Sequence, residues 1–217
     1  MKSGYYSKTK SELLELLKQH YVKHKLIIQK RLEEFRAVSV SKYFYELVYC
    51  ILTPQSSALN AIKSVRKLKS MHFYERGFNP ERVLRDKNNY IRFHKRKSIY
   101  LLLLRNQYPS IKQKLEKTKS PKEIREWLVK NVKGMGYKEA SHFLRNIGKG
   151  ENLAILDRHI LRILKRLKII NSIPGNINKK TYLSIERRLC NFSREIGISP
   201  GELDLVLWSM ATDKILK

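Results

Sequence analysis

The chain has 217 residues, with 46 Lys or Arg against 19 Asp or Glu and a formal net charge of +27 at pH 7. This length can bury a sizeable core in one or two domains, and the basic residues are spread along the whole chain, so the folded body is expected to attract nucleic acid. The two cysteines, Cys50 and Cys190, lie far apart without a CxxC pattern, which argues against a disulfide scaffold, a zinc site and an iron–sulfur cluster.

A basic housekeeping protein of the ribosomal type would carry a similar charge, so charge alone does not identify the partner. No signal peptide opens the chain, and its longest apolar stretches fall well short of a membrane span. We therefore expect an intracellular protein, cytoplasmic and nucleoid-associated, with no membrane partner. Cys50 lies in the apolar run 47–52 and is expected to be a buried thiol.

Helical periodicity runs through almost the whole N-terminal half of the chain. Thr9 or Ser11 suits the N-cap of the first helix, and Pro54 suits the first turn of a helix that restarts after an interruption at 53–57. The helix that begins at Tyr90 is expected to end before Pro109, because proline removes a helical hydrogen bond. The expected helices cover residues 9–19, 22–36, 41–52, 58–68 and 90–108.

The C-terminal half shows the same periodicity, and Ser120 followed by Pro121 is a strong helix start. No run of alternating β-branched residues predicts a sheet, since the strand-like pieces 153–156 and 169–170 are short. The fold class is therefore predicted to be all-α. The further expected helices cover residues 121–132, 137–147, 157–167, 179–197 and 201–211.

The turn Gly134-Met135-Gly136 between two of these helices is the most informative motif. Glycine adopts the positive φ angles that such a turn needs, and the turn's N–H groups can grip a phosphate. Lys138 opens the following helix, whose dipole favours the neutral, nucleophilic form of the amine. Asp157 lies downstream and could complete an amine-plus-acid pair. The three features together suggest covalent chemistry on DNA.

The chain resembles the helix-hairpin-helix superfamily of DNA base-excision glycosylases, and within it the compact archaeal and bacterial-type 8-oxoguanine DNA glycosylase/lyase family. The long and specific match is the block from Gly134 to Asn146. The supporting matches are Leu52-Thr53-Pro54-Gln55, Tyr90-Ile91-Arg92-Phe93-His94, Asp157-Arg158-His159 and residues 205–217.

The resemblance implies two helical domains with a DNA cleft between them. One is expected to be a six-helix bundle over residues 45–148 that ends in the hairpin. The other combines residues 1–44 with 149–217. The resemblance also implies a monomer that binds double-stranded DNA containing 8-oxoguanine.

By the same resemblance, Lys138 is the catalytic amine that attacks the sugar C1′, displaces the base and forms a Schiff base, which then allows β-elimination. Asp157 is the second catalytic residue, which stabilises the sugar cation and assists deprotonation of the lysine. Asp157 could equally be a plain N-cap, and we expect it to do both.

Base recognition by flipping and stacking is expected from Phe93 and Trp208, with Lys217 contacting the oxidised base and Asp204 touching the pocket. Core packing is the alternative for both aromatic residues, and a frayed end is the alternative for Lys217.

DNA binding is expected from the hairpin backbone at Val132, Gly134 and Gly136, from Lys133, and from Gln55 as a wedge into the gap left by the flipped base. His159 resembles the family histidine near the phosphate. A basic cluster on one helix suits the DNA backbone: Arg92, His94, Lys95, Arg96 and Lys97.

No metal-ligating side chain is predicted, although carbonyls of the hairpin could hold a monovalent cation. Three alternatives stay open: an endonuclease III-like enzyme for oxidised pyrimidines, a non-catalytic helix-hairpin-helix module, and a basic RNA-binding protein. The first usually carries four C-terminal cysteines for an iron–sulfur cluster, which this chain lacks. The second gives no reason for Lys138 to be paired with Asp157, and no aromatic ribonucleoprotein motif supports the third.

Overall fold

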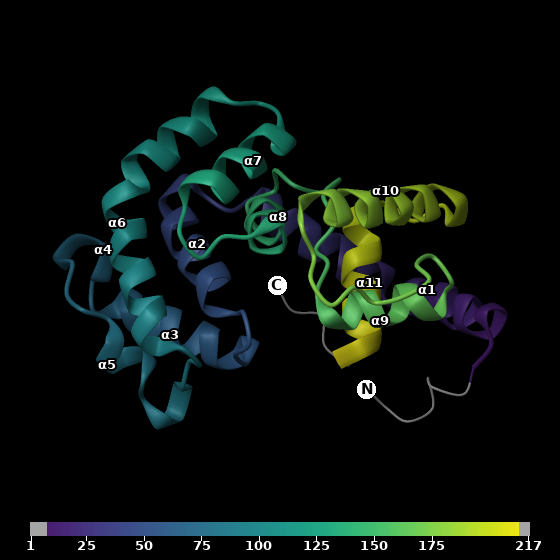
Figure 1. Ribbon diagram of the computed structural model, residues 1–217, viewed down its shortest axis with the longest axis horizontal. Coiled ribbons are helices and arrows are strands. Elements are labelled where there is room, and N and C mark those ends of the chain that lie inside the picture. The colour runs from purple at the N-terminus through teal and green to yellow at the C-terminus, as the bar shows by residue number, and fades with distance from the viewer. Residues whose placement is uncertain (1–7, 213–217) are drawn as a thin grey trace. The chain divides into compact units, whose positions relative to one another are not determined.

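The computed structural model describes residues 8–212, and every regular element in that range is helical (Figure 1). The all-α prediction is therefore confirmed for the described residues. None of these helices is both long and apolar enough to cross a membrane. The elements are α1 Lys10–Arg36, η2 Val40–Lys42, α2 Tyr43–Leu52, α3 Ala58–Ser70, α4 Phe73–Arg76, α5 Glu81–Leu84, η3 Lys87–Asn89, α6 His94–Lys117, α7 Pro121–Asn131, α8 Tyr137–Asn146, α9 Arg158–Arg166, α10 Lys179–Ile196 and α11 Pro200–Thr212.

The chain divides into two compact units. The middle unit is Val38–Ile147, and the terminal unit combines Met1–Ala37 with Gly148–Lys217. The domain expected in the middle of the chain covers residues 45–148. The unit in the structure starts earlier because η2 packs against α2, and it contains α2 to α8, including the single-turn helices α4 and α5.

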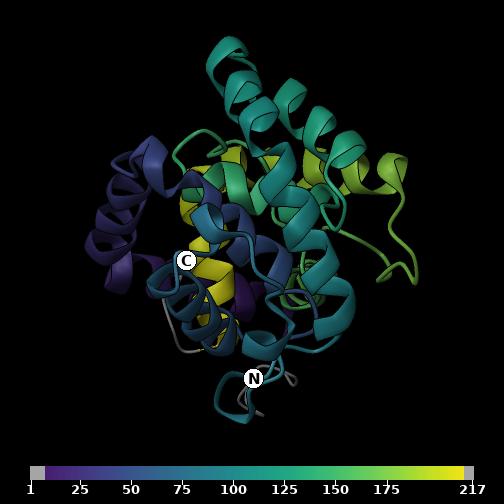
Figure 2. The ribbon, with the colours of Figure 1, turned by 90° about the vertical axis from the view of Figure 1, so that its left-hand side faces the viewer.

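The middle unit is built around α2, whose sequence YFYELVYCIL is apolar on nearly all sides. A helix that is apolar all round is stable only inside a core, and α2 packs against α3, α6 and α8 (Figure 2). Cys50 lies on α2 with no exposed surface, so the expectation of a buried thiol is confirmed. The helix α8, which follows the Gly134–Gly136 turn, thus packs directly against the buried helix α2.

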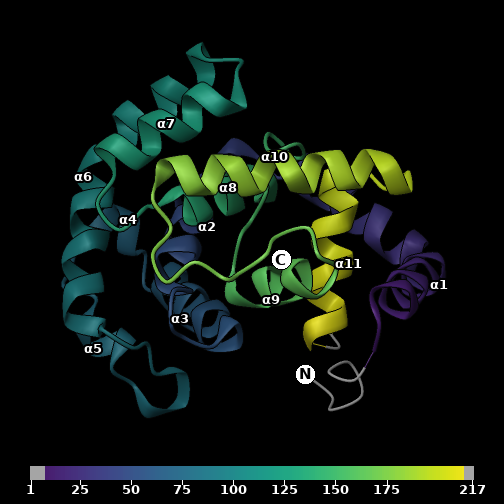
Figure 3. The ribbon, with the colours of Figure 1, turned by 45° about the vertical axis from the view of Figure 1, so that its right-hand side comes forward.

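In the terminal unit, α11 takes the central position and packs against α1, α9 and α10 (Figure 3). Tyr21 and Gln29 of α1 donate hydrogen bonds to the Glu202 carboxylate of α11, at 3.0 and 3.2 Å. Burial, together with the nearby Glu202 charge, raises the pKa of Tyr21 to about 12. The two segments expected at 9–19 and 22–36 form the single helix α1, which begins in a capping box between Thr9 and Glu12.

The expected helix 90–108 is wrong at both of its ends. Phe93 has φ 60 and forms a left-handed N-cap, so α6 starts at His94. At the other end α6 runs through Pro109 to Lys117, because the buried series Leu104, Tyr108, Ile111 and Leu115 continues with helical spacing on both sides of the proline. Pro109 itself is exposed. Burial of that face outweighs the cost of an interior proline, about 3 kcal/mol.

Candidate active site

The helical hairpin of the middle unit is formed by α7, the turn Val132–Gly136 and α8, which pack against each other. Ser120 caps α7 and Pro121 is its first residue, as expected. Gly134 has φ +85, and a Cβ at this position would lie 2.6 Å from Cδ2 of the Tyr100 ring. The turn therefore requires glycine both for its backbone conformation and for the close approach of Tyr100.

Substituting Gly134 tests this requirement against a second glycine. Gly197 also has a positive φ, +68, but a Cβ there would meet nothing within 4 Å. We expect Gly197→Ala to lower the free energy of unfolding by about 1 kcal/mol through backbone strain alone, and Gly134→Ala to lower it by about 2–3 kcal/mol because overlap with Tyr100 adds to the strain. Urea denaturation of the two variants measures the difference. Equal losses would contradict the packing of Tyr100 on the turn.

Two backbone N–H groups of the hairpin already have partners. The Val132 N–H donates to the Leu128 carbonyl at 2.9 Å and closes α7, so this N–H is already used within the hairpin. The Gly136 N–H donates to Oε2 of Glu139 at 3.2 Å, which caps the start of α8. A phosphate that binds at Gly136 must therefore share this N–H with the Glu139 carboxylate.

Lys138 is the second residue of α8 and is partly exposed, with 23% of its side-chain surface accessible. Its Nζ lies 3.7 Å from Oε1 of Glu139, the carboxylate whose other oxygen caps the helix. Cys50 lies beneath it: burial raises the pKa of this thiol, and the positive charges of Lys138 and Arg145 offset part of that effect. The structure thus places an accessible amine at a helix N-terminus, beside a carboxylate held by the hairpin backbone.

Lys97 does not lie on the DNA-facing surface that its neighbours in the sequence suggest. It was expected to face DNA with Arg92, Lys95 and Arg96, and those three are exposed. Lys97 instead is 6% exposed, because it falls on the buried stripe of α6. Its position at helical spacing from the buried Leu101 was the signal in the sequence.

The Lys97 ammonium donates three hydrogen bonds to the last residue of α2 and to the segment that follows it. They reach the Leu52 carbonyl at 2.7 Å, the Pro54 carbonyl at 2.7 Å and Oγ of Ser56 at 3.2 Å. Desolvation is the main cause that lowers the pKa of Lys97 to about 8. The positive charge of Lys138 lowers it further, and the negative charge of Glu139 opposes them.

The lowered pKa of Lys97 predicts a pH dependence of stability. The pKa is about 8 in the folded chain against an ordinary 10.5. Between these pH values the unfolded chain binds more protons than the folded chain, so the free energy of unfolding rises with pH. The increase is complete only above pH 10.5. We expect the stability of the wild type relative to Lys97→Met to be constant below pH 7 and to increase from pH 8 to 10. Parallel urea titrations at each pH measure it, and a constant difference would contradict the prediction.

The predicted wedge residue Gln55 is exposed and has φ 56, in the left-handed region that glycine usually occupies. The next residue, Ser56, accepts a hydrogen bond from the Arg92 backbone N–H at 3.0 Å. The guanidinium of Arg92 lies 4.9 Å from the ring centre of Phe93, which is 47% exposed. The structure therefore brings the segments of Gln55, Arg92 and Phe93 together, and Phe93 is not a core aromatic residue.

Asp157 lies in the terminal unit and caps α9, with its Oδ1 accepting from the Ile160 N–H at 2.8 Å. The preceding buried segment 153–156 is held by α10: the Tyr182 hydroxyl donates to the Ala154 carbonyl at 2.6 Å, and the Ala154 N–H donates to Glu186 at 2.9 Å. The expected N-cap role of Asp157 is confirmed. The carboxylate is partly exposed, and its second oxygen is not used in the cap bond.

The remaining predicted residues of the terminal unit lie on α9 and α11. His159 is half-buried, and within the described chain its Nδ1 has no hydrogen-bond partner. Asp204 is buried, and Trp208 is half-buried one turn later on the same helix. Lys217 lies outside the described residues. In the hairpin, Lys133 is exposed.

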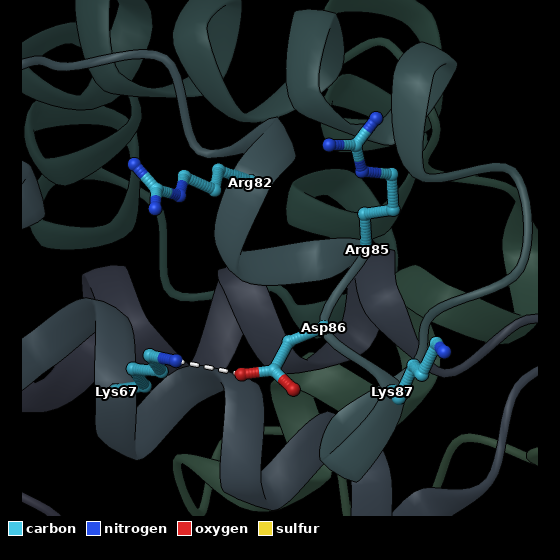
Figure 4. A pocket seen from close by; sticks show the side chains of 5 residues that line it. All are labelled: Lys67, Arg82, Arg85, Asp86 and Lys87. Carbon is cyan, nitrogen blue, oxygen red and sulfur yellow. Dashed lines mark hydrogen bonds and ion pairs between the residues drawn. The ribbon is translucent and has the colours of Figure 1, made fainter.

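A basic hollow lies elsewhere on the middle unit (Figure 4). Lys67 and Asp86 form an ion pair of 2.7 Å there, while Arg82, Arg85 and Lys87 extend away from the Asp86 carboxylate. No predicted site residue lines this hollow. Its net positive charge adds to the field that attracts phosphate, without the geometry of a reaction centre.

Comparison with known proteins decides the family. A model of the 8-oxoguanine DNA glycosylase family matches residues 28–198. The protein named 8-oxoguanine DNA glycosylase/AP lyase from Fusobacterium nucleatum is 40% identical over 96% of this chain and 99% of its own length. This chain belongs to the 8-oxoguanine DNA glycosylase family.

Solved structures of the 8-oxoguanine DNA glycosylase family share the fold. That of the Thermotoga maritima enzyme is 34% identical with a TM-score of 0.83, covering 96% of this chain and all of its own. That of the Methanocaldococcus jannaschii glycosylase/lyase, in complex with 15mer DNA containing 8-oxoguanine, is 37% identical with a TM-score of 0.82, covering 94% of this chain and all of its own. The family match includes Lys138 and Asp157 and ends before Asp204 and Trp208.

Proposed function

We propose that this chain is a base-excision repair enzyme that removes 8-oxoguanine from double-stranded DNA and then cleaves the strand as an AP lyase. The observation that carries the proposal is Lys138, an accessible amine at the start of α8 directly after the Gly134–Gly136 turn. Membership in the 8-oxoguanine DNA glycosylase family and the names of its relatives support the substrate. We further propose that the enzyme is a nucleoid-associated monomer.

The reaction uses the Lys138 amine as nucleophile. Its neutral Nζ attacks the sugar C1′ as the bond from C1′ to the base breaks, and the base leaves with the electron pair and takes up a proton. After the amine has lost a proton, its lone pair forms a C=N bond to C1′ while the C1′–O4′ bond breaks. O4′ takes that electron pair and a proton, so the sugar opens and a Schiff base stands at C1′. Removal of a C2′ proton then expels the 3′ phosphate by β-elimination. The first step needs a neutral amine, because only the unprotonated Nζ has a lone pair with which to attack C1′.

Asp157 supplies negative charge to this chemistry. Its carboxylate stabilises the positive charge that develops on the sugar and assists removal of a proton from the lysine. The cap bond from the Ile160 N–H fixes the orientation of the carboxylate, because it holds one oxygen and leaves the other available. One residue can thereby start α9 and serve the reaction.

Base recognition and DNA binding are assigned to other residues of the two units. Phe93 and Trp208 stack the flipped base, with Asp204 and Lys217 contacting it. Gln55 is the wedge that enters the gap left by the flipped base. The residues that contact phosphates of the DNA backbone are Arg92, Lys133, Gly134, Gly136 and His159.

A monovalent cation at the hairpin fits the donor set of the turn. Backbone carbonyls are suitable ligands for such ions. The Val132 carbonyl accepts one hydrogen bond, from the Met135 N–H at 3.2 Å, and retains a second lone pair. A cation held there would add positive charge facing a phosphate. The proposal includes no iron–sulfur cluster.

The test is borohydride trapping with duplexes that carry one defined lesion. With 8-oxoguanine opposite cytosine, we expect base release, strand cleavage and a covalent adduct between enzyme and DNA. With thymine glycol in the same sequence, we expect far less of each. The reverse preference would favour an endonuclease III-like enzyme, and binding with no adduct on either duplex would favour a non-catalytic module.

A further inference from the structure

The side chain of Lys97 is buried in the middle unit, although it ends in an ammonium group. Taking an ammonium out of water is costly unless its three protons are hydrogen-bonded. Lys97 satisfies this condition with three acceptors: the carbonyls of Leu52 and Pro54 and the hydroxyl of Ser56. Leu52 is the last residue of α2, and Pro54 and Ser56 lie in the turn that follows it, so the ammonium ties α6 to the end of α2 and to that turn.

The turn held by Lys97 is strained. Gln55 has φ 56, in the left-handed region that is unfavourable for a residue with a side chain. Such a conformation persists only where the surroundings enforce it. The acceptors of Lys97 lie directly before and after Gln55, at Pro54 and Ser56. A further hydrogen bond within the turn runs from the Ser56 N–H to the Thr53 carbonyl, at 3.0 Å.

The hydrogen bond between Lys97 and Ser56 also connects the turn to the segment that precedes α6. Ser56 Oγ is bonded both to Lys97 and to the backbone N–H of Arg92, at 3.2 and 3.0 Å. Arg92 precedes Phe93, which is itself in a left-handed conformation with φ 60. One buried ammonium therefore supports the turn of Gln55 directly and the start of α6 through Ser56.

We propose that Lys97 is a positioning residue that clamps the Leu52–Ser56 turn so that Gln55 is held ready to enter the gap left by an extruded base. The inference rests on the proposed function. Lys97 acts on the extrusion of a paired base and not on the Schiff-base chemistry of Lys138. Base excision from duplex DNA depends on it, whereas cleavage of an abasic site in single-stranded DNA, where no base has to be extruded, does not.

The experiment compares Lys97→Met with Lys112→Met, a lysine on the exposed side of the same helix. Two single-turnover rates are measured for each: base excision from an 8-oxoguanine duplex and cleavage of single-stranded DNA with a preformed abasic site. We expect Lys97→Met to lower the duplex rate about tenfold or more, as for loss of a charge-assisted hydrogen bond, and to leave single-strand cleavage within about twofold. Lys112→Met should match the wild type on both substrates.

A double variant tests the route through Gln55. If Lys97 acts by holding Gln55, adding Gln55→Ala to Lys97→Met lowers the duplex rate no further than the more damaging single change. Fully additive losses, equal losses on the two substrates, or no difference from Lys112→Met would each overturn the inference. If Lys97→Met does not fold, Ser56→Ala decides instead, since it removes no charge and takes away the hydroxyl to which both Lys97 and the Arg92 N–H are bonded. It should lower only the duplex rate. A wild-type protein inactive on both substrates would refute the proposed function itself.

Discussion

Lys138→Gln is expected to give no borohydride-trapped adduct and to lower the rate of strand cleavage by about 10³-fold or more, since removal of a covalent nucleophile leaves only binding and electrostatic effects. Glutamine suits a helix almost as well as lysine, and the side chain at this position is partly exposed. The fold and the affinity for the lesion duplex should therefore be retained. Gel-based trapping and single-turnover cleavage measure the effect.

The matched control is Lys122→Gln, an exposed lysine in the first turn of α7. It removes the same charge from the same hairpin and should leave the adduct at the wild-type level. If Lys138→Gln keeps a trapped adduct of wild-type yield, another amine forms the Schiff base and the assignment of the nucleophile fails.

Asp157→Asn is expected to separate the two roles of this residue. Asparagine caps helices as well as aspartate does, so the bond to the Ile160 N–H survives and the free energy of unfolding should change by less than about 0.5 kcal/mol. The negative charge is lost, and base excision should slow by about 10²-fold or more. Asp157→Ala should lose the activity and, in addition, about 1 kcal/mol of stability.

Thermal or urea unfolding and single-turnover excision of the two Asp157 variants measure these effects. Stability that falls equally in both would show that asparagine does not preserve the cap. Excision by Asp157→Asn at the wild-type rate would mean that Asp157 only caps α9 and has no catalytic role.

Local rules predicted much of this fold because the deciding interactions lie within a few residues. Residue type and position predict Ser120 and Asp157 as N-caps and either Thr9 or Ser11 as the N-cap of the first helix. In the structure Thr9, Ser120 and Asp157 each cap their helix. Gly134 was recognised as a turn glycine, and it has the positive φ that the motif needs. These features depend on the backbone next to the residue, which the sequence displays directly.

Features decided by tertiary packing were not predictable in the same way. Pro109 was expected to end a helix, but the buried face of α6 extends past it. Lys97 was grouped with surface lysines because its residue type suggests exposure, and only the fold brings the acceptors of the turn to it. Glu139 was also missed as a neighbour of Lys138, although its place three residues after Gly136 is a capping-box signal.

The most direct measurement of the central claim is the location of the trapped adduct in the chain. The enzyme is reduced with borohydride on an 8-oxoguanine duplex, the DNA is digested, and the protein is mapped by proteolysis and mass spectrometry. Lys97 is the informative competitor, because its pKa, lowered to about 8, gives it a larger neutral fraction than an ordinary lysine while its side chain is buried. We predict that the sugar remnant is on Lys138. A remnant on Lys97, on Lys133 or on any other amine would contradict the account.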